Sequence, residues 1–243
     1  MAIEVFNRYE TKYLIDTKTY NILINELEGR MVPDSCSRDN SFYTICNVYY
    51  DTADSALIRH SLSKPDYKEK LRLRSYGVPQ KGAKVYLEIK KKYNGIVNKR
   101  RCALKLNEAD CLVKNHIYPH IEEYMNRQVL NEIYYLVNRL ELKPMVYIAY
   151  DRRAYFGRDN SDLRITFDTN IRTRRSSVAL EKGDYGEGLL GADMWLMEIK
   201  CAGALPLWLT KILSENHIYK TSFSKYGEEY KQHLINTEER NYA

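Results

Sequence analysis

The 243-residue sequence has few cysteines, and they follow no recognisable pattern. The five cysteines include no C-x-x-C pair, which argues against a disulfide framework and against a thiolate zinc site. No apolar run approaches the roughly 20 residues that a membrane-spanning helix needs. The start, MAIEVFNRYETKY, lacks the apolar core of a secretion signal. We therefore predict no membrane segment and a cytoplasmic location.

The sequence also lacks internal repeats, low-complexity stretches and any obvious linker. Hydrophobic residues make up 44% of the chain, which is enough for a core, and a chain of this length can form one large domain. Disorder is therefore not expected. We predict a single domain over residues 1–243.

Positive charge is present in mild excess but is unevenly distributed. The net charge is +6, which by itself indicates no partner. Residues 64–105, however, contain 14 Lys and Arg and only three acidic residues, a balance of +11 that leaves −5 for the rest of the chain. One segment therefore carries the positive excess.

Alternation with a period of two predicts strands, and helical periodicity predicts the elements between them. The Asn94-Gly95 pair between two of the strands is typical of a hairpin turn. The predicted strands are 5–15, 43–50, 68–76, 83–92, 96–106, 144–156, 162–172 and 194–201, and the predicted helices are 17–28, 53–62, 120–141, 206–217 and 223–234. We therefore predict an α+β fold with a large antiparallel sheet.

The alternation separates charged from apolar side chains on several strands. In KEKLRLRSYG, Lys70, Arg72 and Arg74 share one face, and Leu71 and Leu73 share the other. The same separation recurs in RYETKY, KVYLEIKKK, VYIAYDRRAY, LRITFD and MEIK. A solvated sheet face is the ordinary interpretation. Arginine, however, is concentrated at these positions, and its planar fork binds phosphate through two hydrogen bonds.

If the sheet closes, the charged faces point inward and the apolar faces meet covering helices. Such an interior is a water-filled, electropositive tunnel suited to a polyanion. Single carboxylates among the arginines could then hold a divalent metal that neutralises part of the phosphate charge.

Seven motifs, in order from residue 6 to residue 230, together resemble a known family. They are RYETKY, KLRLRSYG, YLEIKKK, YDRRAY, LRITFDTNIR, MEIK and SFSKY. The combination resembles the VTC (vacuolar transporter chaperone) domain, the polyphosphate polymerase branch of the CYTH-like triphosphate tunnel metalloenzymes. The resemblance implies an antiparallel eight-stranded β-barrel, or tunnel, with a basic interior and covering helices. It also implies Mn²⁺ or Mg²⁺ as cofactor, and transfer of the γ-phosphate of ATP or another nucleoside triphosphate onto polyphosphate.

The resemblance assigns roles to residues of the matching motifs. The expected catalytic residues are Arg72, Arg74, Lys90, Arg152, Arg164 and Lys200. The expected substrate-binding residues are Lys12, Lys70, Lys99, Arg101, Lys225 and Tyr150, of which Lys70 and Tyr150 are included because they share strand faces with Arg72 and Arg152. The expected metal ligands are Glu198 first, then Glu10 and Glu88.

Two positions depart from the wider superfamily pattern. Its first strand reads E-x-E-x-K, whereas this chain has Arg8 at the first position, which favours the VTC branch over triphosphatases and class IV adenylate cyclases. The last motif offers one lysine, Lys225, where some members have two, and Ser222 lies near the other position.

Two other signals are assigned no function. Gly186–Gly191 matches G-x-G-x-x-G but precedes a predicted strand, whereas a dinucleotide-binding loop precedes a helix. The 22 tyrosines could stack on nucleic acid bases, but core packing explains most of them, including Tyr49 and Tyr134.

Four hypotheses follow from these observations. The first is a polyphosphate polymerase. The second is a triphosphatase of the same superfamily, and the third is a non-catalytic module that binds polyphosphate or nucleotide. A nucleic-acid binder is the fourth and is not expected, because it needs the arginine faces on an open surface. The sequence leaves open whether a membrane protein accompanies the domain.

Overall fold

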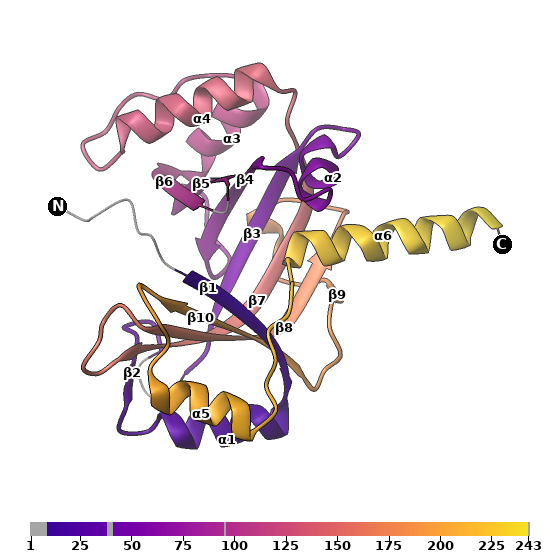
Figure 1. The fold of residues 1–243 in the computed structure, drawn as a ribbon. Helices are drawn as coiled ribbons and strands as arrows, with labels where there is room; N and C mark the ends of the chain where they lie inside the picture. The colour runs from indigo at the N-terminus through magenta and orange to yellow at the C-terminus, as the bar shows by residue number, and fades with distance from the viewer. Residues whose placement is uncertain (1–8, 38–40, 95, 243) are drawn as a thin grey trace.

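One large antiparallel sheet organises the fold (Figure 1). The computed structural model describes residues 9–37, 41–94 and 96–242. The strands are β1 (Tyr9–Asp16), β2 (Met31–Pro33), β3 (Tyr43–Asp51), β4 (Tyr67–Tyr76), β5 (Lys84–Tyr93), β6 (Ile96–Lys105), β7 (Lys143–Gly157), β8 (Arg164–Arg174), β9 (Glu187–Gly188) and β10 (Met194–Cys201). The helices are α1 (Thr17–Leu27), α2 (Ala56–Leu62), α3 (Leu106–Asn115), α4 (Arg127–Arg139), α5 (Leu207–Glu215) and α6 (Lys225–Tyr242).

Eight strands follow one path through the sheet, in the order β1-β10-β8-β7-β3-β4-β5-β6. The short strands β2 and β9 pair with β7 and β8. The α+β fold with a large antiparallel sheet is thus confirmed, as is the meander β4-β5-β6. Within the described residues, the end strands β1 and β6 form no backbone ladder with each other, so the predicted closure is not seen as strand pairing. Arg8 and Gly95 lie outside the described residues.

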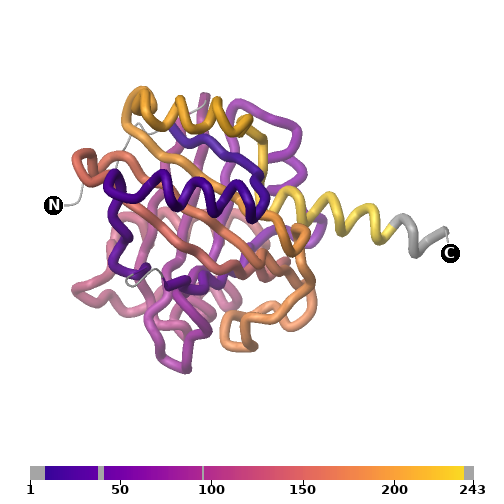
Figure 2. The backbone as a smooth tube through the Cα atoms, turned by 90° about the horizontal axis from the view of Figure 1, so that it is seen from below, coloured from indigo at the N-terminus to yellow at the C-terminus, as the bar shows by residue number. Residues whose placement is uncertain are grey.

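Helices cover two opposite outer sides of the sheet, with α3 and α4 on one side and α1 and α5 on the other (Figure 1). On one side, Leu71, Leu87 and Leu104 pack with residues of α3 and α4. On the other, Phe167 and Met197 pack with residues of α1 and α5, which lie together on that side in Figure 2. The predicted arrangement, with apolar faces toward covering helices, is therefore present.

The charged side chains consequently occupy the opposite face, which we call the inner face. One end of the inner face is apolar, because Val146, Ile148 and Leu196 pack there with Phe223, just before α6, and with Tyr226 in its first turn. Asp51 joins α2 to this end, since it accepts hydrogen bonds from the Leu57 backbone N–H and from the Tyr226 hydroxyl, both at distances under 3 Å. Helix α6 therefore closes one end of the inner face and then extends away from the body of the molecule (Figure 1).

The differences from the predicted elements have local causes. Helix α3 was not predicted, and the predicted strand 96–106 ended on its first residue, because Leu104 and Leu106 continue the alternation. The Glu108 side chain accepts a hydrogen bond from the Lys105 backbone N–H at 2.8 Å and so helps to start this helix. Helix α4 begins at Arg127 rather than at residue 120, because Asn126 caps it through the Val129 backbone N–H.

The glycine-rich run 186–191 has no helix after it and lies along β8 through β9. A Cβ atom at Gly186 would lie 2.6 Å from the Thr173 carbonyl oxygen, so close backbone approach accounts for glycine at this position. No helix among the described residues is long and apolar enough to cross a membrane.

Candidate functional site

The predicted site residues lie on the inner face and come from seven strands and one helix. Cross-strand register places them side by side, since Lys12 lies opposite Glu198, Arg152 opposite Asp168, and Arg72 opposite Glu88. They form two groups. We name these the Glu198 cluster (Glu10, Lys12, Arg152, Asp168, Glu198, Lys200, Lys225) and the Glu88 cluster (Arg72, Arg74, Glu88, Lys99).

Glu198 lies at the centre of the first cluster. Its carboxylate oxygens lie 3.3 Å from Lys12 Nζ, 3.7 Å from Arg152 Nη2, and 3.8 Å from the Nζ atoms of Lys200 and Lys225. Burial would raise the pKa of Glu198, but these four cations outweigh it and hold that pKa well below its usual range. Glu198 is therefore a carboxylate at neutral pH.

Glu10 shares its cations with Glu198. Its carboxylate lies 3.5 Å from Lys12 Nζ and 3.7 Å from Lys200 Nζ. Burial and the charge of Glu198 both act to raise the pKa of Glu10, yet Lys200, Lys90 and Lys12 lower it overall. Since Lys90 belongs to β5 and Glu10 to β1, charges from the two ends of the sheet act on each other across the inner face.

Asp168 is the carboxylate that joins the sheet to α6. It is fully buried, accepts hydrogen bonds from Arg152 Nε and Nη2 at 2.6 and 2.7 Å, and accepts another from Lys225 Nζ at 2.6 Å. Burial would raise the pKa of Asp168, but Arg152 and Lys225 lower it. The bidentate pair fixes the Arg152 guanidinium plane.

The second cluster surrounds a single carboxylate, Glu88. Arg72 Nε donates to Glu88 Oε2 at 2.7 Å, Lys99 Nζ lies 2.9 Å from Oε1, and Arg74 Nε lies 3.8 Å from Oε2. Burial would raise the pKa of Glu88, whose side chain is 1% exposed, but the charges of Arg72, Arg74 and Lys99 lower it. Three cations thus share one carboxylate.

A row of lysines adjoins the Glu88 cluster. Lys70, Lys90 and Lys99 lie opposite one another on β4, β5 and β6. Burial, together with the charges of Lys90, Lys68 and Lys12, lowers the pKa of Lys70 to about 8, although Tyr49 acts in the opposite direction. Like charges that face one another create a strong positive potential, which an anion would relieve.

Two tyrosines contact the cations of the clusters, and one of them, Tyr150, contacts both clusters. The Tyr150 hydroxyl accepts a hydrogen bond from Arg74 Nη2 at 3.3 Å, and the cations of Lys225 and Arg152 lie 4.3 and 5.1 Å from its ring centre. Tyr49 was assigned to core packing, and its ring does pack among apolar residues, but its hydroxyl accepts a hydrogen bond from Arg72 Nη1 at 3.0 Å. The core assignment of Tyr49 is therefore incomplete.

The two remaining predicted residues lie at the edges of the clusters. Arg164 Nη2 donates to the buried Asp34 carboxylate at 3.2 Å, and Arg164 lies opposite Lys200 on β10. Arg101 lies opposite Glu88 on β6, is exposed, and stacks over the Tyr86 ring at 4.9 Å.

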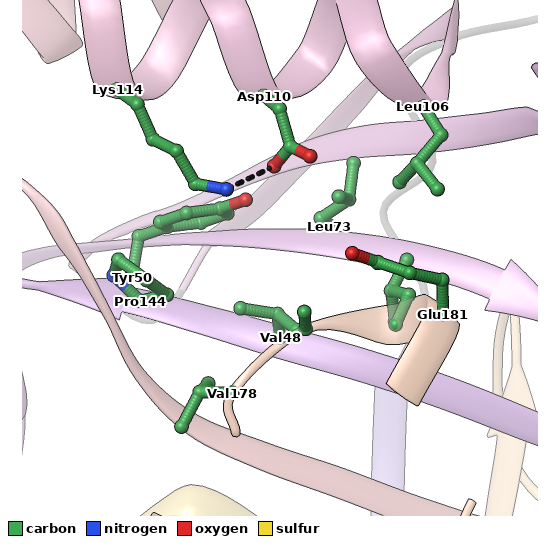
Figure 3. A pocket seen from close by; sticks show the side chains of 11 residues that line it. Val48, Tyr50, Leu73, Leu106, Asp110, Lys114, Pro144, Val178 and Glu181 are labelled. Atoms are coloured by element: carbon green, nitrogen blue, oxygen red, sulfur yellow. Dashed lines mark ion pairs between the residues drawn. The ribbon is translucent and has the colours of Figure 1, made fainter. Parts of the chain in front are cut away.

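A small pocket lies on the outer side of the sheet, beneath α3 (Figure 3). Val48, Leu73 and Leu106 line it, and its Asp110 and Lys114 pair with each other at 3.0 Å. It lies apart from the inner-face clusters and contains none of the predicted site residues.

The family model of the VTC domain matches residues 7–234. The chain belongs to the VTC domain family. Among solved structures, a protein of Bacillus halodurans described as a "putative adenylate cyclase" shares the fold, with 16% identity, coverage of 91% of this chain and 96% of that chain, and a TM-score of 0.55. A protein of Vibrio parahaemolyticus with the same description matches at 10% identity, with coverage of 93% and 99% and a TM-score of 0.46. No curated protein matches.

The predicted metal ligands of this VTC domain do not gather at one point. Glu10 and Glu198 share Lys12 and Lys200, whereas Glu88 belongs to the other cluster. Within the described residues, no three His, Cys, Asp or Glu side chains are grouped as a metal site. The VTC domain thus offers one pair of carboxylates and one separate carboxylate.

Sequence reasoning missed three inner-face residues of the VTC domain. Asp168 shares its strand face with Arg164, so strand alternation alone could have placed it among the inner-face residues. Asn47 is fully buried, and its Oδ1 accepts a hydrogen bond from Arg74 Nε at 3.0 Å. Asp34 follows β2 and gives no sequence signal, since its contact with Arg164 spans 130 residues.

Proposed function

We propose that this VTC domain is a phosphotransferase that binds the triphosphate of ATP on the inner face and transfers the γ-phosphoryl group to polyphosphate. The observation that carries the proposal is the convergence of cationic side chains from seven strands and α6 on one face, with only a few carboxylates among them. A solvated face would not place its cations in such enclosed contact, whereas a bound polyanion would balance their charge.

The geometry suits phosphoryl transfer, which requires mainly alignment and charge stabilisation. Arg72, Arg74 and Arg152 have their guanidinium planes fixed by Glu88, Asn47 and Asp168, so their forks are oriented before any phosphate arrives. The lysines supply mobile charge around them.

In the proposed step, a terminal oxygen of polyphosphate forms a bond to the γ-phosphorus as the bond from that phosphorus to the bridging oxygen breaks. The nucleoside diphosphate leaves with the electron pair. The attacking oxygen is already ionised, so no side chain has to remove a proton.

The implied Mn²⁺ or Mg²⁺ fits one part of the inner face. Mg²⁺ is commonly held by one or two carboxylates together with substrate phosphates, and Glu198 and Glu10 form such a pair. The metal, when bound, would neutralise charge on the phosphates. Glu88 fits less well, because Arg72 Nε and Lys99 Nζ lie 2.7 and 2.9 Å from its two oxygens, whereas the four cations around Glu198 lie 3.3 to 3.8 Å away.

The test is an assay of the purified chain with ATP and Mn²⁺, followed by separation of the phosphate products. Long-chain polyphosphate is expected, and Arg74→Ala or Glu198→Ala should lower its formation at least about 100-fold, since each removes a buried charge-assisted contact to phosphate or metal. Arg127→Ala, an exposed arginine at the start of α4, is the matched control and should keep full activity. All variants are compared for unfolding temperature.

The products discriminate the remaining hypotheses. Release of orthophosphate without polymer would overturn the polymerase and indicate a triphosphatase. Saturable, salt-sensitive binding of polyphosphate without turnover would indicate a binding module.

A further inference from the structure

Three tyrosines near the end of the inner face opposite α6 form an aromatic group that the proposed chemistry does not use. The ring centres of Tyr43 and Tyr76 are 6.2 Å apart, and those of Tyr76 and Tyr86 are 5.9 Å apart in an edge-to-face arrangement. We name Tyr43, Tyr76, Tyr86 and the stacked Arg101 the tyrosine patch. Tyr76 is 48% exposed, so core packing does not account for it.

The tyrosine patch directly adjoins the arginines of the proposed phosphate site. Tyr86 on β5 lies opposite Arg74 on β4, and Tyr43 on β3 lies opposite Arg152 on β7. Directly opposite residues on neighbouring strands have side chains roughly 5 Å apart at Cβ. A group bonded to a phosphate held by Arg74 or Arg152 therefore lies within reach of the rings.

The patch is also held in place. The Tyr43 hydroxyl donates to the Asp34 carboxylate at 3.2 Å, and the same carboxylate binds Arg164. Burial and the charge of Asp34 raise the pKa of Tyr43, despite the opposing charges of Arg152 and Arg164, so its hydroxyl stays protonated and keeps this bond. The ring of Tyr43 is thus preorganised, while Tyr76 presents its ring to solvent.

We propose that the tyrosine patch binds the nucleobase of the nucleoside triphosphate by stacking. This inference rests on the proposed function. It adds a site for the base of the substrate, which the basic residues around the phosphates do not contact. Aromatic rings and an arginine plane are the groups on which bases stack, and stacking tolerates different bases because every base has a π-face. We expect the patch to favour nucleotides over inorganic phosphate chains without selecting strongly among bases.

The test compares the affinities of ATP and inorganic tripolyphosphate, which share the phosphate chain but differ in the nucleoside. Calorimetric titration should show that Tyr76→Ala weakens ATP binding roughly tenfold, within the range for loss of one base–aromatic contact. The affinity for tripolyphosphate should stay within about twofold. Tyr76→Phe keeps the ring and should bind ATP as the unmodified chain does. Tyr135→Ala, on the outer helix α4 and 67% exposed, is the matched control.

Each other outcome has a definite meaning. Equal losses for ATP and tripolyphosphate would overturn the inference, because the ring would then act on the phosphates or on the fold. An unchanged ATP affinity in Tyr76→Ala and in the double variant with Tyr86→Ala would overturn it while leaving the proposed function intact. If the unmodified chain bound neither ligand, the proposed function would fail, and the inference with it.

Discussion

The inner face has two halves that differ in how their charge is balanced. The half built by β1, β7, β8, β10, α6 and the segment after β2 places five cations with four carboxylates, namely Lys12, Arg152, Arg164, Lys200 and Lys225 with Glu10, Asp34, Asp168 and Glu198. The half built by β4, β5 and β6 places six cations with one carboxylate, namely Lys70, Arg72, Arg74, Lys90, Lys99 and Arg101 with Glu88. The first half is nearly neutral, and we call it the balanced half. The second is strongly positive, and we call it the positive half.

The difference in charge indicates different roles for the two halves in the proposed reaction. The strongly positive half has few internal partners for its cations, so it gains most from an incoming phosphate chain. In the proposed reaction, the carboxylates of the balanced half would be the ones available to a metal, because phosphates could pair with their cations. The six cations of the positive half all lie in the basic segment 64–105 of the sequence. The acidic remainder of the chain supplies the carboxylates of the balanced half.

The largest expected effect tests whether the balanced half also holds the fold together. Asp168→Asn leaves Arg152 and Lys225 buried without their carboxylate, and breaking a buried pair in this way costs about 3–5 kcal/mol. We expect a corresponding drop in the free energy of unfolding in urea, and lower transferase activity because Arg152 loses its fixed orientation. Asp159→Asn, in the exposed turn before β8, should change neither. Unaltered stability in Asp168→Asn would show that the link between β8 and α6 is dispensable.

The sequence predicted the positive half better than the balanced half, and the reason is physical. Strand alternation assigns side chains to faces, and the meander β4-β5-β6 brings consecutive strands together, so Arg72, Glu88 and Lys99 could be grouped from local sequence alone. In the balanced half, β1 pairs with β10, so Lys12 meets Glu198 across 186 residues. Only the family resemblance joined those residues before the fold was known.

The missed residues follow the same logic. Asp34 and Asn47 act through contacts that depend on how loops and neighbouring strands are placed, and no periodicity reveals such a contact. Sheet closure was likewise inferred from the resemblance, and backbone pairing between β1 and β6 is absent from the described residues. Periodicity predicts faces, whereas long-range register has to come from the folded chain.

An intermediate effect should separate metal binding from phosphate binding. Glu198→Gln should raise the Mn²⁺ concentration for half-maximal activity roughly tenfold or more, since even residues that only support metal ligands contribute 10–100-fold to affinity. Glu88→Gln should leave that concentration nearly unchanged and should strengthen tripolyphosphate binding several-fold, because the Gln amide oxygen can still accept the hydrogen bond that orients Arg72 but no longer offsets its charge. If both variants raised the Mn²⁺ concentration for half-maximal activity equally, the proposal that the metal binds in the balanced half would be wrong.

The smallest expected effect concerns the charge of Lys70 in the positive half. Because the folded pKa is lowered to about 8, Lys70 is charged below that pH and loses its proton above it. The affinity of the unmodified chain for tripolyphosphate should therefore fall several-fold more between pH 7 and pH 9 than the affinity of Lys70→Met, which has no lysine to titrate at this position. Lys81→Met, in the turn between β4 and β5, should keep the unmodified profile.

The same lowered pKa predicts the opposite trend for stability, which makes the assignment to Lys70 specific. Between pH 8 and pH 10.5, the unfolded lysine keeps its proton while the folded one has lost it, so the contribution of Lys70 to the free energy of unfolding rises over that window. Binding that weakens while this contribution grows cannot result from unfolding. If the difference between the unmodified chain and Lys70→Met did not change with pH in either measurement, Lys70 would have the pKa of a solvated lysine, and the strong positive potential inferred around it would be wrong.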